Sequence, residues 1–243
     1  MPRDWDADAY DTLPIPMTGW DRAVVDRLQL RGDERVLDAG CGTGQVTAYL
    51  LERLATGSVV ALDGSPSMVE AARARLRAER VTFLVHDLLD PIPIEPVDAV
   101  LSTATFHWVP DHERLFANLA AVMRPGALLA AQCGGGGNIA NVARAAAQVG
   151  LDVERDKVFA DPRTTTSRLE SAGFSDVRCW LTNEPTDVPA EELERYLRTV
   201  CMGAVIEGLA DEEADRLIRD VARRMDEPRI DYVRLNIDAR KAA

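Results

Sequence analysis

Lysine is almost absent from this sequence of 243 residues, and acidic side chains outnumber basic ones. Lys157 and Lys241 are the only lysines among 28 basic residues, which stand against 40 acidic ones and leave a net charge of −12. Proteins that bind nucleic acid or anionic membranes cluster Lys and Arg, and the longest basic run here is Arg223-Arg224. We therefore expect neither nucleic acid nor membrane as a partner.

Patterns typical of disulfides, metal sites and membrane spans are also missing. The cysteines form no CxxC pair and have no His at ligand spacing, which predicts free buried thiols and no metal. No apolar run reaches the ~18 residues of a membrane span, and the acidic N-terminus lacks the apolar core of a signal peptide. We expect a cytoplasmic protein. The four cysteines are Cys41, Cys133, Cys179 and Cys201.

Short apolar runs alternate with segments of helical periodicity from residue 35 onward. Such alternation predicts a parallel sheet buried on both faces, and right-handed crossovers make it a doubly wound α/β fold in a single domain, 1–243. Ligands of such sheets bind at the carboxyl ends of the strands. The expected strands are 35–37, 59–62, 81–85, 97–101, 127–132, 177–181 and 232–237, and the expected helices between them are 45–55, 65–76, 112–123 and 164–172.

Two further amphipathic helices, about 189–206 and 211–225, precede the last expected strand. We expect them to form a helical cap over about 187–226, inserted between the last two strands and placed to cover an active site. Residues 1–30 are expected to form an N-terminal lid with helices, and residues 31–135 a ligand-binding core.

A glycine-rich loop directly follows the first expected strand. Asp38 precedes Gly40, Gly42 and Gly44, so backbone N–H groups are presented at the start of a helix. Asp63 ends the next strand, where a carboxylate can accept hydrogen bonds from both hydroxyls of a ribose. Loop and carboxylate together predict a site for an adenosine-containing ligand.

The spacing of the loop distinguishes between such ligands. The third glycine of the dinucleotide fingerprint G-x-G-x-x-G would fall on Gln45, and no Gly-Lys-Ser/Thr follows, so NAD is disfavoured and a P-loop is excluded. Asp38 suits a positively charged amino group better than a pyrophosphate. This favours S-adenosylmethionine.

Three segments resemble the motifs of class I S-adenosylmethionine-dependent methyltransferases, whose fold is a seven-stranded Rossmann-like sheet. Residues 38–44 resemble the first motif, 61–68 the second and 86–88 the third. The resemblance implies S-adenosylmethionine as cofactor and S-adenosylhomocysteine as product. It further implies cofactor contacts from Asp63, Gly64, Met68, Asp87 and Leu88, and we add Ser102 at the end of the fourth strand.

The loop after the fourth strand lacks the Asn-Pro-Pro-Tyr type of motif, paired glutamates and a metal-binding carboxylate cluster. Together with the acidic charge, this predicts a small-molecule acceptor. The segments 5–10, 63–68, 96–100 and 106–112 resemble the trans-aconitate methyltransferase group, which forms methyl esters on a small polycarboxylate. That resemblance implies lid residues Trp5, Tyr10 (also expected to contact the cofactor) and Trp20, and acceptor-side residues His107 and Trp108.

His107 is the candidate catalytic residue, with three roles open: general base, hydrogen bond to the acceptor, or a purely structural histidine. Asn138, after four glycines, is expected either to line the acceptor site or to cap a helix. Arg144 and Arg234 could hold an acidic acceptor despite the net charge.

We expect methyl transfer to oxygen of a small molecule, a carboxylate or a hydroxyl. C- or N-methylation and a non-catalytic S-adenosylmethionine-binding protein remain the alternatives. The sequence does not indicate the oligomeric state.

Overall fold

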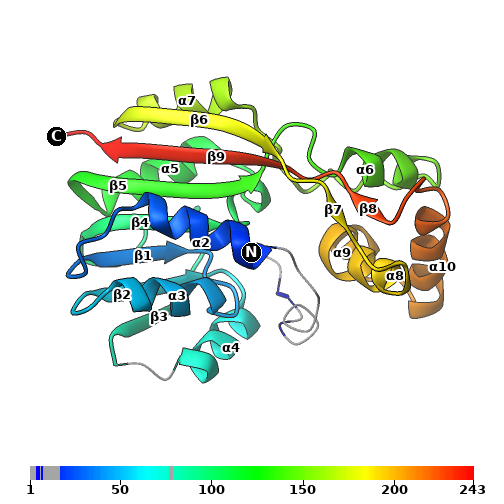
Figure 1. Ribbon diagram of the computed structural model, residues 1–243, viewed down its shortest axis with the longest axis horizontal. Helices are drawn as coiled ribbons and strands as arrows, with labels where there is room; N and C mark the ends of the chain where they lie inside the picture. The colour runs from blue at the N-terminus through cyan, green and yellow to red at the C-terminus, as the bar shows by residue number, and fades with distance from the viewer. Residues whose placement is uncertain (1–3, 6, 8–16, 77–78) are drawn as a thin grey trace.

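The computed structural model describes residues 4–5, 7, 17–76 and 79–243. Seven strands form one sheet of order β3-β2-β1-β4-β5-β9-β6 (Figure 1). Six of them run in the same direction, and β9 runs in the opposite one. The expected doubly wound, seven-stranded α/β fold is confirmed. The strands are β1 (Arg35–Ala39), β2 (Ser58–Asp63), β3 (Val81–Val85), β4 (Val97–Thr103), β5 (Met123–Gly134), β6 (Phe174–Asn183) and β9 (Val233–Lys241).

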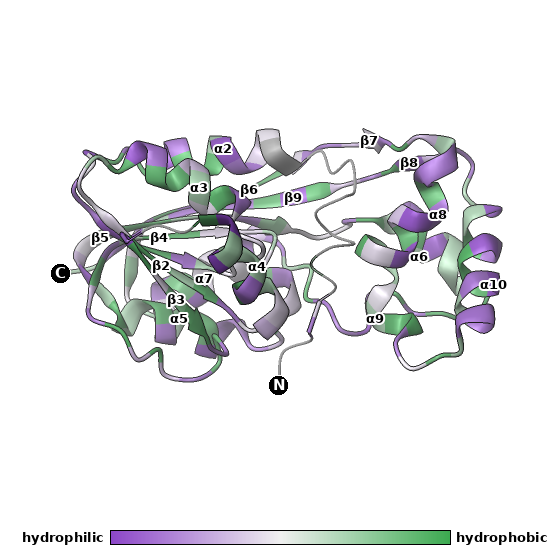
Figure 2. Cartoon of the chain, turned by 90° about the horizontal axis from the view of Figure 1, so that it is seen from below, coloured by the Kyte–Doolittle hydropathy of each residue, from purple (hydrophilic) through white to green (hydrophobic). Residues whose placement is uncertain are grey.

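Helices cover both faces of this sheet (Figure 2). Neighbouring residues of a strand point to opposite faces, so Val36 packs in the hydrophobic cluster beneath α2 and α3, whereas Leu37 packs in the cluster beneath α5 and α7. On α4, Ala72 packs against Ala61 of β2. The helices are α2 (Met17–Arg27), α3 (Gln45–Arg53), α4 (Pro66–Leu76), α5 (His112–Ala121) and α7 (Pro162–Ser171).

A second lobe, the cap, is carried at the end of the β6–β9 pair. The two strands continue outward as a two-stranded ribbon of β7 (Thr186–Asp187) and β8 (Arg229–Ile230), and the chain between them forms helices. The cap lies beyond the carboxyl ends of β1, β4 and β5 (Figure 1). The expected position of the insertion, between the last two strands, is therefore confirmed.

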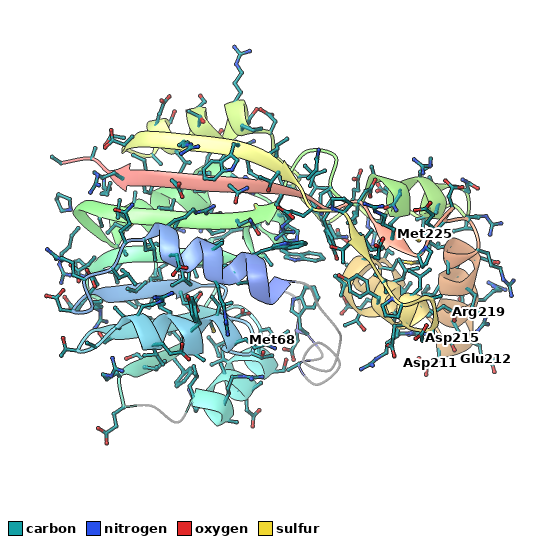
Figure 3. All side chains as sticks on the ribbon, viewed as in Figure 1. Met68, Asp211, Glu212, Asp215, Arg219 and Met225 are labelled. Carbon is teal, nitrogen blue, oxygen red and sulfur yellow. The ribbon has the colours of Figure 1, made fainter. Side chains whose placement is uncertain are left out.

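The cap has its own hydrophobic core, to which α6 (Ala140–Ala147) and α10 (Asp211–Ala222) contribute. The outer face of α10 is charged, with Asp211, Glu212 and Asp215 exposed at the edge of the molecule (Figure 3). The sequence analysis missed α6, although its alanine-rich segment has high helix propensity.

The single helix expected over 189–206 is wrong. The segment contains Thr199, Val200 and Gly203, which are poor helix formers, and the structure breaks it into short pieces. These are η2 (Ala190–Glu192), α8 (Leu193–Tyr196), the π-helix η3 (Leu197–Cys201) and α9 (Gly203–Ile206).

Packing explains the first two glycines of the run Gly134–Gly137, which begins at the last residue of β5. A Cβ on Gly134 would lie 2.7 Å from the Phe159 ring, and one on Gly135 would lie 2.6 Å from Leu181. Asn138 does not cap α6, because its Oδ1 accepts from the N–H of Val233 at 3.0 Å and the N-cap is Ile139. The capping alternative is therefore wrong.

The N-terminal helix α2 belongs to the core layer, since Val24, Val25 and Leu28 are fully buried. The division into lid, core and cap stays a prediction. Over the described ranges, no helix has the length and apolar content needed to cross a bilayer.

Candidate functional site

A cavity of about 670 Å³, the large cavity, lies at the carboxyl ends of β1 to β4. It collects residues from the glycine loop, from the ends of β2 and β3 and from the N-terminal segment, and the cap closes one side with Ala204 and Glu207. Seven predicted cofactor residues line it: Gly40, Gly42, Asp63, Gly64, Met68, Asp87 and Leu88.

Asp38 is fully buried at the base of the glycine loop. Its Oδ2 accepts from the Thr47 hydroxyl at 2.6 Å, whereas its Oδ1 has no hydrogen-bond partner among the described residues. Burial raises the pKa of Asp38 to about 7, and the nearby Asp63 adds to the rise. A buried carboxylate oxygen without a donor is costly, so this atom fits a positively charged group of a ligand.

Asp63 ties the glycine loop to the turn after β2. Its two oxygens accept from the backbone N–H groups of Gly42 and Ser65, both at 2.9 Å. Burial raises its pKa despite these donors. A carboxylate has about four acceptor positions, and the backbone of Gly64 also contributes a hydrogen bond, so acceptor capacity remains for a ligand.

Asp38 lies at the base of the glycine loop and not in the lining of the large cavity, and four further predicted residues are placed elsewhere or not described. Gly44 is the N-cap of α3 and has φ +80°. The hydroxyl of Ser102 donates to the carbonyl of Ala39 at 2.7 Å. Neither residue lines the large cavity. Trp20 packs on Tyr232 and under Arg234, outside the lining of either cavity. Tyr10 lies outside the described residues.

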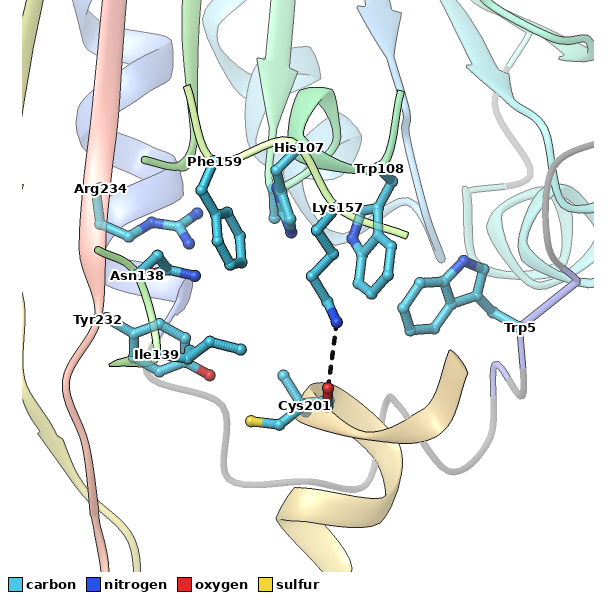
Figure 4. A pocket seen from close by; sticks show the side chains of 12 residues that line it. Trp5, His107, Trp108, Asn138, Ile139, Lys157, Phe159, Cys201, Tyr232 and Arg234 are labelled. Atoms are coloured by element: carbon cyan, nitrogen blue, oxygen red, sulfur yellow. Dashed lines mark hydrogen bonds between the residues drawn. The ribbon is translucent and has the colours of Figure 1, made fainter. Parts of the chain in front are cut away.

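A second cavity of about 50 Å³, the small pocket, adjoins the large one and shares Trp5, Ala104 and Trp108 with it. It lies between the end of the sheet and the cap, and Figure 4 shows the side chains around it. Three other predicted residues or candidates line it: His107, Asn138 and Arg234. The sequence analysis missed Ile139, Lys157, Phe159, Val200, Cys201 and Tyr232.

His107 reaches the small pocket from η1 (Phe106–Trp108), the turn after β4. Its Nδ1 accepts from the backbone N–H of Gly134 at 3.3 Å, and its ring stacks on Phe159. Burial, together with the positive charges of Arg234 and Lys157, holds the pKa of His107 well below its ordinary value. The ring is therefore neutral at pH 7, and because Nδ1 is an acceptor, Nε2 carries the proton.

Arg234 supplies a buried guanidinium at the start of β9. Its side chain is 3% exposed, its Nε donates to Gln132 at 3.5 Å, and no carboxylate lies within ion-pair distance among the described residues. Asn138 lies beside it, and because Oδ1 is bound to Val233, its amide nitrogen faces the pocket (Figure 4). Arg144, the other candidate, lies exposed on the cap near Asp226.

Lys157 lies along the opposite side of the small pocket and is already engaged. Its ammonium lies over the ring of Trp108 and donates to the carbonyl of Val153. It also donates, at 3.3 Å, to the carbonyl of Cys201, which belongs to the π-helix (Figure 4). Trp5 packs edge-on against Trp108 at 5.0 Å between ring centres. The two tryptophans thus stand between the small pocket and the large cavity.

The two cavities have opposite charge. Among the described residues, the large cavity is lined by the carboxylates of Asp4, Asp63, Asp87, Asp156 and Glu207 and by no Lys or Arg. The small pocket is lined by Arg234 and Lys157 and by no carboxylate. This arrangement suits a cationic ligand in one cavity and an anion in the other.

The residues around the large cavity fit S-adenosylmethionine. A Cβ on Gly42 would meet no atom within 4 Å, so the loop leaves space directly above its backbone. Asp38 would hold the amino group and Asp63 the ribose, with Met68 and Asp87 at the adenine.

Comparisons with known proteins place this site in a family. The model of the family "Methyltransferase domain" matches residues 37–131. A trans-aconitate 2-methyltransferase from Methylobacterium nodulans is 32% identical over 181 residues, which are 74% of this chain and 67% of that protein. For several other trans-aconitate 2-methyltransferases that it matches, the chain spans about half their length.

Solved structures share the fold at lower identity. The YcgJ protein of Bacillus subtilis has a TM-score of 0.65 and 15% identity, with coverage of 93% of this chain and 99% of that chain. A phosphoethanolamine N-methyltransferase of Haemonchus contortus, solved with S-adenosylhomocysteine, has a TM-score of 0.63 and 19% identity over 93% of this chain and 53% of that chain. The chain belongs to the class I S-adenosylmethionine-dependent methyltransferases.

Proposed function

We propose that this methyltransferase forms a methyl ester on the carboxylate of a small molecule. The observation that supports this most strongly is Arg234, a buried guanidinium with no carboxylate at ion-pair distance among the described residues, in a pocket next to the large cavity. Asp21 interacts with this guanidinium at longer range. Guanidinium groups bind carboxylates with two parallel hydrogen bonds, and Asn138 adds a further donor. Some relatives are named for trans-aconitate, a carboxylic acid, which agrees with this choice.

When bound, S-adenosylmethionine supplies a methyl group already activated on a sulfonium, so the chain needs mainly to position the acceptor. Trp5 and Trp108 line both cavities where these join, so they would flank the acid as it meets the methyl group, while Arg234 and Asn138 orient the acid. A carboxylate is ionised at pH 7 and requires no proton removal before it reacts.

His107 acts in this proposal as a hydrogen-bond donor to the acid through Nε2. Its Nδ1 lone pair is taken by Gly134, so the ring has no free lone pair to serve as a general base. Such a base would be needed for a hydroxyl or a carbon acid. An amine acceptor would favour carboxylates, and none lines the small pocket among the described residues. These points disfavour the alternatives of hydroxyl, C- and N-methylation.

The test is turnover of small carboxylic acids, followed as release of S-adenosylhomocysteine, in the wild type and in Arg234→Met. We expect this variant to raise the KM for the acid about 10- to 100-fold, because charged hydrogen bonds contribute about 1.5–3 kcal/mol, while affinity for S-adenosylmethionine stays unchanged. Arg144→Met, on the exposed cap surface, is the control. Wild-type turnover by Arg234→Met would contradict the proposal.

A further inference from the structure

We propose that the acceptor is a monocarboxylate with a short apolar or planar body, and that the small pocket selects against a second negative charge. This inference rests on the proposed function and specifies its substrate class. It sets this chain apart from the relatives that are named for trans-aconitate, which carries three carboxylates.

The small pocket offers one cation, not two, for binding an anion. The guanidinium of Arg234 donates to Gln132 at 3.5 Å, contacts aromatic rings and interacts at longer range with Asp21, so donors remain for a ligand at hydrogen-bond distance. The ammonium of Lys157 instead donates to two carbonyls and covers the Trp108 ring. Lys157 thus fastens the segment before α7 to the cap, and the pocket can neutralise one carboxylate through Arg234.

The remaining walls are apolar and belong to the core of the cap. Ile139 and Tyr232 are almost completely buried there, and Val200 packs against the same cluster. The hydroxyl of Tyr232 is paired with that of Tyr196 at 2.5 Å. A second carboxylate that pointed toward the cap would lose its hydration without gaining a cation, which is strongly unfavourable.

A second carboxylate that pointed the other way would meet negative charge. The large cavity, which the small pocket joins at Trp5, Ala104 and Trp108, carries Asp156 and Glu207 on its cap side. Both are exposed, so their repulsion is weaker than the loss of hydration on the cap side. Both directions nevertheless disfavour a dicarboxylate.

The volume of the small pocket points to a small acid. A group the size of a water molecule needs about 10–15 Å³ of cavity volume. The small pocket, at about 50 Å³, therefore holds roughly four such groups. A carboxylate with a few carbons fills this space, and the aromatic rings of Phe159 and Trp108 favour a flat body.

The experiment compares acids of increasing charge: crotonate, trans-glutaconate and trans-aconitate. Release of S-adenosylhomocysteine is measured with the full chain at saturating S-adenosylmethionine, and binding is measured by calorimetry with S-adenosylhomocysteine present. We expect kcat/KM for crotonate to exceed that for trans-glutaconate at least about tenfold, and trans-aconitate to be poorer still.

A gain-of-function variant tests the wall itself. Val200→Lys places a cation where the wall is apolar, so the ratio of trans-glutaconate to crotonate turnover should rise several-fold, whereas the neutral Val200→Met should leave it unchanged. If wild type prefers trans-glutaconate or trans-aconitate, or if Val200→Lys leaves the ratio as in wild type, the monocarboxylate assignment is overturned and the proposed function stands. If no acid binds or is methylated, whereas an uncharged hydroxyl compound such as phenol is methylated, both the monocarboxylate assignment and the proposed function are overturned.

Discussion

The backbone N–H of Gly134 donates to Nδ1 of His107 at 3.3 Å, linking the end of β5 to the turn after β4. Gly134 also has to be a glycine, because a Cβ there would clash with Phe159, whose ring stacks on His107. One backbone position therefore fixes both the orientation of the imidazole and its neutral form. Two predictions concern the role and the charge of this ring.

His107→Ala should lower turnover of the acid by about 10- to 100-fold through loss of one hydrogen bond to a charged group, with unchanged affinity for S-adenosylmethionine. His107→Gln should recover part of this loss, because its side-chain oxygen can accept from Gly134 while its nitrogen donates to the acid. At saturating S-adenosylmethionine, turnover between pH 6.5 and 8 should be flat in the wild type. A rate that rises with pH across this range would support a general base instead.

Protonation of His107 should also be visible in the pH dependence of stability. Its pKa is lowered in the folded protein, so at this one group the unfolded chain binds more protons than the folded one below about pH 6.5, and the contribution of His107 to the free energy of unfolding falls as the pH decreases. Asp21 and Asp38, whose pKa values are raised by burial, act in the opposite direction, so the prediction concerns the difference between variants: from pH 7 to 5 in denaturant titrations, His107→Gln should lose less stability, or gain more, than the wild type. An unchanged slope in His107→Gln would argue against a buried neutral ring.

S-adenosylmethionine binding should release a proton near neutral pH. Burial raises the pKa of Asp38 to about 7, so about half of the free protein carries a protonated carboxyl at that pH, and an ammonium placed on Oδ1 favours the ionised form. The dissociation constant should therefore increase as the pH falls below 7. Calorimetry in phosphate and in Tris buffer at pH 7 should give different heats.

Asp21 titrates in the same range, since burial raises its pKa to about 7. Asp21→Asn separates the two carboxyls, and proton release should persist in this variant. Equal heats in both buffers, with a constant dissociation constant from pH 6 to 8, would exclude the assigned role of Asp38.

The patterns that the sequence could predict are local ones. Gly40 and Gly42 follow β1 and Asp63 ends β2, and parallel strands bring their carboxyl ends to one edge, so order along the chain was enough to assemble this part of the large cavity, with Asp38 buried at the base of the loop. Short apolar runs between segments of helical periodicity likewise predicted all seven strands of the main sheet.

The small pocket depends on contacts that no local pattern encodes. Lys157 follows a segment without clear periodicity, and it reaches the pocket because the π-helix presents the Cys201 carbonyl. Arg234 was a candidate from charge alone, and its importance comes from being buried with no carboxylate at ion-pair distance among the described residues. Such properties follow from the packing of the cap on the core.

Two glycines of the loop should respond differently to alanine. In Gly40→Ala the new Cβ would lie 2.0 Å from Oγ1 and 2.6 Å from Cβ of Thr105, at φ +87°, so the loop must shift and the protein should lose several kcal/mol of stability. In Gly42→Ala the Cβ meets no protein atom within 4 Å, so the cost should be about 1–2 kcal/mol from positive φ alone. That Cβ would instead occupy space in the large cavity. Gly42→Ala should thus remain folded in thermal denaturation and lose most affinity for S-adenosylmethionine in calorimetry. Wild-type affinity in Gly42→Ala would mean that the cofactor does not lie against this loop.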